Sequence, residues 1–250
     1  MIYAIVNQKG GVGKTTTAVN LAACLAEAGQ KVLVIDLDPQ SNATSGLGML
    51  DAESPTIADV LLDGAEPSEA IVTTRIENLD LARGDPDLAG AAVELPSRER
   101  REYLLADAFT GLAADYRFVF IDCPPSLDLL TVNALAAADR LIVPVQCEYY
   151  ALEGLSRLME TVLHVRAGLN PRLRVSGMLM TMHDGRTRVS TEVVSEIRRH
   201  FPELAFRTIV PRNVRVAEAP SYGEPVIRYD PLCAGSDAYF DVAKEVAERG

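Results

Sequence analysis

The amino-acid sequence predicts a single α/β domain over residues 1–250, in which a mostly parallel, twisted sheet carries helices on both faces. Apolar runs alternate with helical stretches along the chain. The runs Phe118–Asp122 and Leu141–Val145 are almost continuously apolar, as expected of strands that are covered on both faces. With 250 residues, of which 48% are hydrophobic and 24% charged, the chain is long enough to bury one sizeable core.

The expected elements follow this alternation in order. The first strand runs directly into a glycine-rich turn, and the helix after it places Ala18, Leu21, Ala22 and Leu25 on one apolar stripe. Residues 41–96 are the least regular part, because Gly, Pro and Asp are scattered through them. The expected strands are Ile2–Asn7, Val32–Asp36, an edge strand near Leu79–Ala82, Phe118–Asp122, Leu141–Val145, Ser176–Met182 and Phe206–Val210. The expected helices are Lys14–Ala28, Ile57–Leu62, Arg98–Ala113, Leu127–Ala137, Ala151–Ala167, Val189–His200 and Ser236–Glu248.

Composition and charge argue against several classes of protein. No apolar run approaches the roughly 20 residues that a membrane-spanning helix needs, and the N-terminus lacks the basic lead of a signal peptide. We therefore expect a cytoplasmic protein without a membrane partner. The four cysteines are too scattered to indicate a zinc site, an iron–sulfur site or a disulfide framework. The net charge of −11 argues against non-specific adhesion of the whole molecule to nucleic acid.

The charge is unevenly distributed along the chain. The window from Arg166 to Arg215 contains ten arginines, no lysine and four acids, a balance of +6 that leaves −17 on the remainder. In the helix expected within this window, the apolar residues share one face, which leaves Arg198 and Arg199 on another. The window therefore allows a local basic face on an acidic body. An ordinary solvated surface is the competing interpretation for either arginine.

The glycine-rich turn between the first strand and the first helix carries the strongest motif. It reads Lys9-Gly-Gly-Val-Gly-Lys-Thr-Thr16. Glycines let the backbone curl so that several N–H groups point inward, and the N-terminus of the next helix adds positive potential. The turn thus predicts a polyphosphate site, in which Lys14 lies along the β- and γ-phosphates and the Thr15 hydroxyl holds Mg²⁺. Gln8 replaces the first glycine of the usual pattern, and Lys9 adds a second lysine inside the loop.

Acidic residues end two of the expected strands. The strand Phe118–Asp122 ends in Asp122, the form expected of a residue that holds Mg²⁺ through water. The strand Val32–Asp36 runs into a turn that contains Asp38. Because ligands collect at the carboxyl ends of parallel strands, we expect Asp122 and Asp38 to meet the phosphate loop at one edge of the sheet. Asp36 is equally compatible with a cap or a turn.

Four segments of the chain carry a family resemblance. They are Lys9-Gly-Gly-Val-Gly-Lys-Thr-Thr-Thr17, Asp36-Leu-Asp-Pro-Gln40, Ile121-Asp-Cys-Pro-Pro-Ser126 and Val210-Pro-Arg-Asn-Val-Arg-Val-Ala-Glu-Ala-Pro-Ser221. Together they resemble the ParA/Soj chromosome- and plasmid-partition ATPases, which are deviant-Walker ATPases of the wider MinD/ParA group. The resemblance extends from the first strand to about Pro225. It looks like the short form of the family, without an added N-terminal helix-turn-helix domain.

The resemblance implies an ATPase with a weak intrinsic rate and ATP and Mg²⁺ as cofactors. Lys9 matches the signature lysine, which reaches across an ATP-sandwich homodimer to the phosphates of the other subunit, as an arginine finger would. Asp38 matches the residue that positions or polarises the attacking water, and with Lys9 and Lys14 it completes the implied catalytic set. Thr15 and Asp122 match the Mg²⁺ positions. The implied nucleotide contacts are Lys9, Gly10, Gly11, Val12, Gly13, Lys14, Thr15, Thr16, Pro211 and Asn213, of which the last two match the segment that contacts the adenine.

The resemblance also implies macromolecular partners. In the family, arginines in regions that correspond to Arg198, Arg199 and Arg215 help the ATP-bound dimer to hold DNA without sequence specificity. Phosphate contacts of this kind would make binding depend strongly on salt. A ParB-like partner protein would stimulate hydrolysis. The implied location is cytoplasmic and associated with the nucleoid.

Three alternatives use the same kind of fold. A MinD-like positioning ATPase for another cargo would favour a basic amphipathic C-terminal helix, whereas residues 237–250 are acidic and short. A ligase or kinase that amidates or phosphorylates a small carboxylate would need a substrate pocket, on which the sequence is silent. A nucleotide-dependent scaffold without hydrolysis would lack a catalytic group, whereas Lys9, Lys14, Asp38 and Asp122 are all present.

Overall fold

The computed structural model describes residues 1–148 and 153–249. Within these residues the chain forms a seven-stranded sheet in the order β3-β4-β2-β5-β1-β6-β7. All neighbouring strands are parallel except β3 and β4. The strands are β1 (Ile2–Ile5), β2 (Val32–Asp36), β3 (Ile71–Thr73), β4 (Leu79–Ala82), β5 (Phe118–Asp122), β6 (Arg140–Gln146) and β7 (Arg174–Thr181). This arrangement confirms the predicted single α/β domain.

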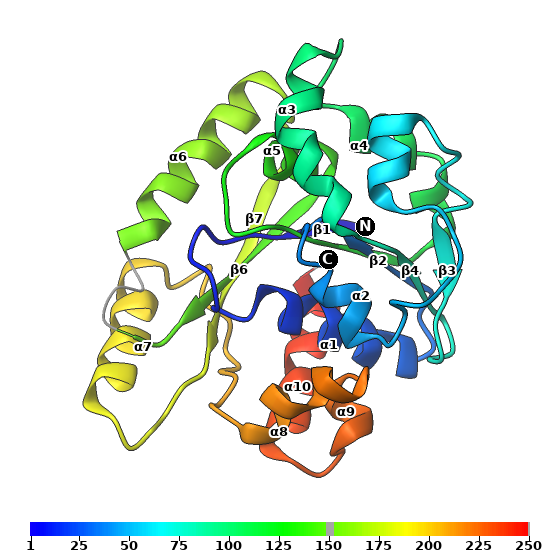
Figure 1. Ribbon diagram of the computed structural model, residues 1–250. Coiled ribbons are helices and arrows are strands. Elements are labelled where there is room, and N and C mark those ends of the chain that lie inside the picture. Colours follow the sequence, from blue (N-terminus) through cyan, green and yellow to red (C-terminus); the bar gives the residue numbers. More distant parts are fainter. Residues whose placement is uncertain (149–152, 250) are drawn as a thin grey trace.

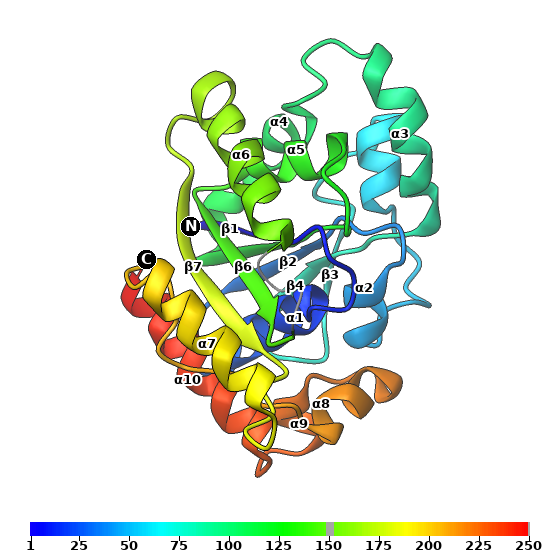
Figure 2. The same ribbon diagram turned by 90° about the vertical axis from the view of Figure 1, so that its left-hand side faces the viewer.

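Helices cover both faces of the sheet (Figure 1). The view turned by 90° in Figure 2 brings the side of the molecule that carries α6 and α7 toward the viewer. The helices are α1 (Lys14–Glu27), α2 (Asn42–Gly46), α3 (Ala91–Glu94), α4 (Leu104–Phe109), α5 (Leu129–Ala137), α6 (Glu153–Gly168), α7 (Arg188–His200), α8 (Val214–Glu218), α9 (Val226–Tyr229) and α10 (Ala234–Arg249). Single turns of other helix types are η1 (Asp59–Asp63), η2 (Pro86–Gly90), η3 (Leu95–Ser97), η4 (Leu112–Asp115) and η5 (Ala219–Tyr222). In the described part of the chain, no helix combines the length and the apolar character that a membrane crossing requires.

Alternation of side chains along the strands divides the interior into two cores. In β1, Tyr3 and Ile5 join the core under α1 and α10, whereas Ala4 joins the core on the opposite face. Successive residues of a strand point to opposite faces, so a strand covered on both faces has to be apolar throughout. This explains why the central strands lack a polar face and were visible in the sequence as continuous apolar runs.

Parallel register brings the carboxyl ends of the central strands to one edge of the sheet. Asp122, at the end of β5, pairs in register with Ile5 of β1 on one side and with Asp36 of β2 on the other. The phosphate loop leaves β1 beside these two acids. The convergence expected from the sequence therefore follows directly from the strand order.

The predicted helix over residues 98–113 is wrong in its first half, where α4 begins only at Leu104. The side chain of Asn133, which comes from α5, occupies the place of one helical hydrogen bond. Its amide group donates to the Arg101 carbonyl at 2.7 Å, and its carbonyl oxygen accepts from the Leu105 N–H at 3.1 Å. These two backbone groups would otherwise bond to each other in a helix.

Two further predictions differ from the structure. The strand β4 is one position away from the sheet edge, because β3 pairs with it as an antiparallel edge strand. The strand expected at Phe206–Val210 is absent from the described elements, and its place is taken by isolated bridges at Ala205 and Pro211 on either side of the segment. The helix expected at Ala151–Ala167 appears as α6, but residues 151 and 152 lie outside the described part.

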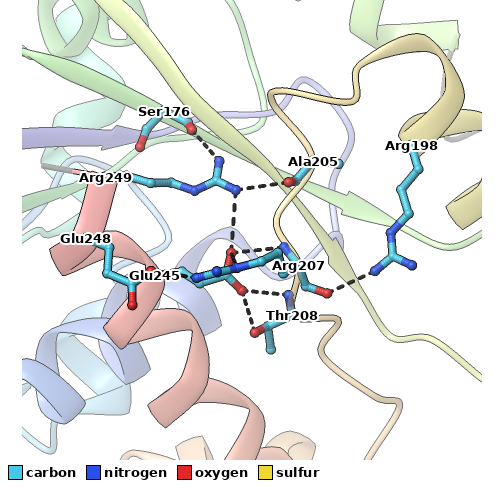
Figure 3. Close-up of polar contacts among 8 residues, drawn as sticks. All are labelled: Ser176, Arg198, Ala205, Arg207, Thr208, Glu245, Glu248 and Arg249. Carbon is cyan, nitrogen blue, oxygen red and sulfur yellow. Dashed lines mark hydrogen bonds and ion pairs between the residues drawn. The ribbon is translucent and has the colours of Figure 1, made fainter.

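Side chains from α10 hold the segment that fails to form a strand (Figure 3). The buried Glu245 carboxylate accepts hydrogen bonds from the Arg207 N–H at 2.9 Å, from the Thr208 N–H at 2.7 Å and from the Thr208 hydroxyl at 2.6 Å. The Arg249 guanidinium donates to the carbonyls of Ser176 and Ala205 at 2.9 and 3.0 Å. Backbone groups that a strand would pair with another strand are thus paired with side chains.

We expect Glu245→Gln to lower the free energy of unfolding by about 1–3 kcal/mol at pH 7, the usual range for hydrogen bonds to a charged group. Burial alone would raise the pKa of Glu245, but the hydrogen bonds from Thr208 and Arg207 outweigh burial and lower it. The carboxylate therefore stabilises the fold above the ordinary glutamate pKa of 4.5, and this contribution disappears as the pH falls through the lower folded value.

Denaturant unfolding between pH 7 and pH 3 measures this effect. The difference in the free energy of unfolding between the wild type and Glu245→Gln should become smaller as the pH falls below the ordinary glutamate pKa. Glu248→Gln is the matched control, because the Glu248 side chain is 64% exposed and pairs only with Arg207 among the described ion pairs. It should change stability by less than about 1 kcal/mol. Equal losses for both variants would contradict the role of Glu245.

Candidate nucleotide-binding site

The turn between β1 and α1 depends on glycines with left-handed backbone angles. Gly11 has φ 71° and Gly13 has φ 87°, in the region that side-chain-bearing residues rarely adopt. Gly13 is also the N-cap of α1, and no side chain caps the first turn of that helix. The first N–H groups of α1 are therefore free of a capping side chain, an arrangement that favours an anion at this end.

This turn borders a cavity of about 540 Å³. Gly10, Gly11, Gly13, Lys14, Thr15 and Thr16 line it, and Asp38 from the turn after β2 lines it as well. A second cavity of about 140 Å³ shares Gly13, Thr16 and Met182 with the first, and Pro211 and Asn213 line it. The adjoining cavities have the size of a small-molecule site. The phosphate loop and the predicted adenine segment thus border two adjoining cavities.

Lys14 is buried at the floor of this region, with only 7% of its surface exposed. Its ammonium group donates to the Lys9 carbonyl at 3.4 Å. Burial lowers the pKa of Lys14 below its ordinary value. The negative charges of Asp122 and Asp38 act in the opposite direction and offset part of this effect. A buried cation needs such counter-charges, so Lys14 and the two acids form one electrostatic unit.

Asp122 is fully buried, and neither of its carboxylate oxygens has a hydrogen-bond partner among the described residues. Burial and the neighbouring Asp36 carboxylate raise the pKa of Asp122, whereas the nearby Thr15 hydroxyl lowers it. Buried polar atoms without a partner are rare, and they indicate a missing ion or water. Carboxylate and hydroxyl oxygens are ligands that Mg²⁺ prefers. Thr15 and Asp122 therefore fit a magnesium ion or its bound water.

Asp38 lies in the turn after β2 and is 5% exposed. Its carboxylate accepts the Gln40 N–H at 2.9 Å, and its own N–H donates to the Asp36 carboxylate at 3.3 Å. Because it lines the same cavity as Lys14 and Thr15, it can face a molecule held by the phosphate loop. The geometry suits a carboxylate that orients a water beside a phosphate group.

Two residues of the loop, Lys9 and Val12, lie differently from the rest. The Lys9 ammonium is 3.9 Å from the Glu148 carboxylate, its side chain is 37% exposed, and it does not line the large cavity. Glu148 also pairs with Arg212 at 3.1 Å. Val12 is buried, and its carbonyl accepts the Thr181 hydroxyl at 2.8 Å, which ties the loop to β7. The buried side chain of Val12 does not line the large cavity, so its contribution to the loop is structural.

Several residues that line the large cavity were not predicted from the sequence as site residues. They come from α1, from the α2 region, from the turn after β5, from the end of β7 and from the segment around η5, and they are Val19, Asn20, Gln40, Asn42, Ser45, Gly46, Pro125, Met182, Ala219, Pro220 and Glu224. Asn20 joins two of these parts, because its side-chain oxygen accepts the Val226 N–H at 2.8 Å. Part of this wall had a sequence signal, because Gln40, Pro125, Ala219 and Pro220 stand within the segments that carry the family resemblance.

The three arginines expected to contact DNA lie on two different helices. Arg198 and Arg199 are exposed on α7, and Arg215 is on α8. Arg198 donates to the Arg207 carbonyl at 2.9 Å (Figure 3), whereas Arg199 pairs with Glu196 at 2.8 Å. Arg215 pairs with two acids, Glu218 at 3.0 Å and Asp230 at 3.2 Å. Arg198 thus keeps more of its charge available than Arg215.

Comparison with known proteins places the chain in a family. A family model described as an AAA domain matches residues 1–175. The chain is 51% identical over 250 residues to the sporulation initiation inhibitor protein Soj of Bacillus subtilis, covering 100% of this chain and 99% of that protein. It is 50% identical over 251 residues to the chromosome partitioning protein ParA of Caulobacter vibrioides, covering 99% and 94% respectively.

A solved structure with the same fold carries a nucleotide. It is cobyrinic acid a,c-diamide synthase from Mycobacterium smegmatis with a bound ATP analog and magnesium. The TM-score is 0.85 at 38% sequence identity, and the alignment covers 99% of this chain and 94% of that one. The full-length identity to Soj and ParA is higher. The chain belongs to the ParA/Soj family of chromosome-partitioning ATPases.

Proposed function

We propose that this protein is an ATP-dependent switch for DNA partition. It binds MgATP, forms an ATP-sandwich homodimer that holds DNA without sequence specificity, and hydrolyses ATP slowly until a ParB-like partner stimulates it. The observation that carries the proposal is the unpartnered, buried Asp122 carboxylate beside Lys14 and Thr15 at the phosphate loop. A metal-bound polyphosphate supplies both a cation for Asp122 and an anion for Lys14.

Different residues around the two cavities contact different parts of the nucleotide. The loop N–H groups and Lys14 hold the phosphates, Thr15 holds Mg²⁺ directly, and Asp122 holds it through water. Pro211 and Asn213 contact the adenine in the smaller cavity. Asp38 orients the attacking water. The magnesium-bound ATP analog in the related synthase structure supports this assignment.

Dimerisation would depend on Lys9. In the described chain this ammonium lies outside the large cavity and pairs with a surface carboxylate at 3.9 Å, a weak contact that a stronger anion can replace. A cation supplied by the neighbouring subunit can neutralise charge that develops during phosphoryl transfer. ATP bound in one subunit would thus offer the γ-phosphate as the anion that attracts Lys9 of the other.

DNA binding would use the basic surface of α7 and its surroundings. Arg198 makes no ion pair with an acid among the described contacts, and Arg199 on the same helix keeps 69% of its side chain exposed. Formation of the dimer doubles the number of phosphate contacts, so a weak patch on the monomer becomes a useful patch on the dimer. The protein would accordingly associate with the nucleoid in the cytoplasm.

Other functions of the fold remain distinguishable from this one. Amidation of a small carboxylate is the second candidate, because a cobyrinic acid a,c-diamide synthase shares the fold at 38% identity. The identity of 50–51% to Soj and ParA over nearly the full length favours partition.

An ATPase assay with and without DNA and a ParB-like protein separates the partition function from the synthase function. Stimulation by these partners supports partition, and turnover that requires a small carboxylate and an amine donor supports the synthase. A MinD-like positioning ATPase for another cargo would respond to neither a ParB-like protein nor a carboxylate.

We expect Asp38→Ala to bind ATP as the wild type does but to accumulate a dimer with little turnover. Removing the carboxylate takes away the group that orients water and leaves Lys14 and the loop N–H groups in place. Equilibrium ATP binding, sedimentation and phosphate release measure the three properties. Asp85→Ala is the control, because Asp85 lies outside both cavities, at the N-cap of η2. Normal turnover in Asp38→Ala would refute the role assigned to Asp38.

We expect Arg198→Ala combined with Arg215→Ala to weaken DNA binding while sparing ATP-driven dimerisation. The slope of log affinity against log salt should fall by about one for each phosphate contact removed. Arg198→Ala alone should have the larger effect, because two acids already neutralise Arg215. Binding to a DNA fragment, measured at several salt concentrations, tests this. Arg75→Ala, an exposed arginine after β3, is the control. An unchanged salt slope in the double variant would contradict the assignment.

A further inference from the structure

The role of Asp36 is not explained by nucleotide binding. Asp36 is fully buried at the end of β2, and its side chain does not line either cavity. Its carboxylate accepts three hydrogen bonds, from the Thr44 N–H at 2.8 Å, from the Thr44 hydroxyl at 2.7 Å and from the Asp38 N–H at 3.3 Å. A buried carboxylate is expensive to desolvate, so three donors aimed at one side chain indicate a specific task.

One part of that task is to cap the N-terminus of α2, although Asp36 lies outside this helix. The short helix α2 has Ser41 at its N-cap, in a left-handed conformation with φ 52°, and the Ser41 side chain makes no capping hydrogen bond. Thr44 is the third residue of α2, where a capping side chain normally accepts the N–H. Asp36 accepts that N–H instead. The carboxylate thus satisfies the start of α2 from the end of the preceding strand.

The same contact is anchored to a third segment of the chain. The Thr44 hydroxyl accepts the Gly84 N–H at 3.1 Å, just after β4. Gly84 approaches Asp36 so closely that a Cβ atom there would lie 2.7 Å from the Asp36 carbonyl oxygen. Only glycine fits this approach without a shift of the backbone. Hydrogen bonds therefore run from Gly84 through Thr44 to Asp36, and they join β2, α2 and the end of β4.

We infer that Asp36 and Thr44 are positioning residues for ATP hydrolysis. One carboxylate binds the N–H of Asp38 and the N–H of Thr44, and so closes the loop of residues 37–43 at both of its ends. Asp38 belongs to this loop and faces the cavity, where its carboxylate accepts the Gln40 N–H. The inference rests on the proposed role of Asp38 as the residue that orients water. Loss of the Thr44 hydroxyl would leave Asp38 present but displaced.

The test compares Thr44→Val, which removes the hydroxyl at nearly constant volume, with Thr44→Ser, which retains it. Small displacements of a catalytic group reduce the chemical step while leaving binding intact, so Thr44→Val should lower kcat by about tenfold or more. The ATP affinity of Thr44→Val and the kcat of Thr44→Ser should both stay within about twofold of the wild type. Thr44→Ala removes the same hydroxyl and replaces Thr44→Val if that variant does not fold.

Thr74→Val is the matched control. Thr74 is also a buried threonine, and its hydroxyl donates to the Leu79 carbonyl at 2.7 Å and accepts the Ile76 N–H at 3.1 Å. It lies between β3 and β4 and lines neither cavity. Thr74→Val should lower the Tm as Thr44→Val does but leave kcat unchanged. Equal losses of kcat in both variants would show that Thr44 acts only through stability and would overturn the inference.

Asp38→Ala, measured beside these variants, separates the inference from the proposed function. If Asp38→Ala hydrolyses ATP normally, the role of Asp38 fails, and the positioning role fails with it. If Asp38→Ala is inactive while Thr44→Val keeps the wild-type kcat, the proposed function stands and the positioning role alone is overturned. A change confined to the KM of Thr44→Val would also overturn it. Loss of kcat in Thr44→Val, with recovery in Thr44→Ser, supports it.

Discussion

The structure depends on charge that is buried at the carboxyl edge of the sheet. Asp36 and Asp122 are fully buried and lie opposite each other in the register of β2 and β5. Burial raises the pKa of Asp36 to about 6 and also raises the pKa of Asp122. The two carboxylates differ in their hydrogen bonds. Asp36 accepts three, whereas Asp122 accepts none from the described residues. The unsatisfied acid is thereby left for a ligand.

This constraint connects the site to the rest of the fold. Lys14 is the one buried lysine among the described residues, and its charge is opposed by Asp122 and Asp38. In the proposed function, a magnesium–polyphosphate complex would change the local charge around both Lys14 and Asp122. The loop that carries Asp38 is held by Asp36, which lies beside Asp122 in the sheet. A ligand that binds at Asp122 would therefore act next to the residue that holds the loop to which we assign the orientation of water.

Most of the fold was predictable because its signals are local. Continuous apolar runs identified the central strands, and the glycine-rich turn identified the phosphate loop from its composition alone. The errors arose where a side chain from a distant element replaces a backbone hydrogen bond. Asn133 shortens the helix before α5, and Glu245 holds residues 207 and 208 out of a strand. The part of the cavity wall formed by α2 was missed for the same reason, since Asp36 caps α2 from another element.

The central claim is that ATP binding and dimerisation are carried by different lysines of one loop. Sedimentation of Lys9→Ala with ATP and Mg²⁺, combined with an equilibrium measurement of ATP affinity, tests it most directly. Lys14→Ala is the reference variant that should neither bind ATP nor dimerise. The account predicts that Lys9→Ala binds ATP like the wild type yet stays monomeric at concentrations where the wild type dimerises. An ATP-dependent dimer of Lys9→Ala with the wild-type stability would contradict it.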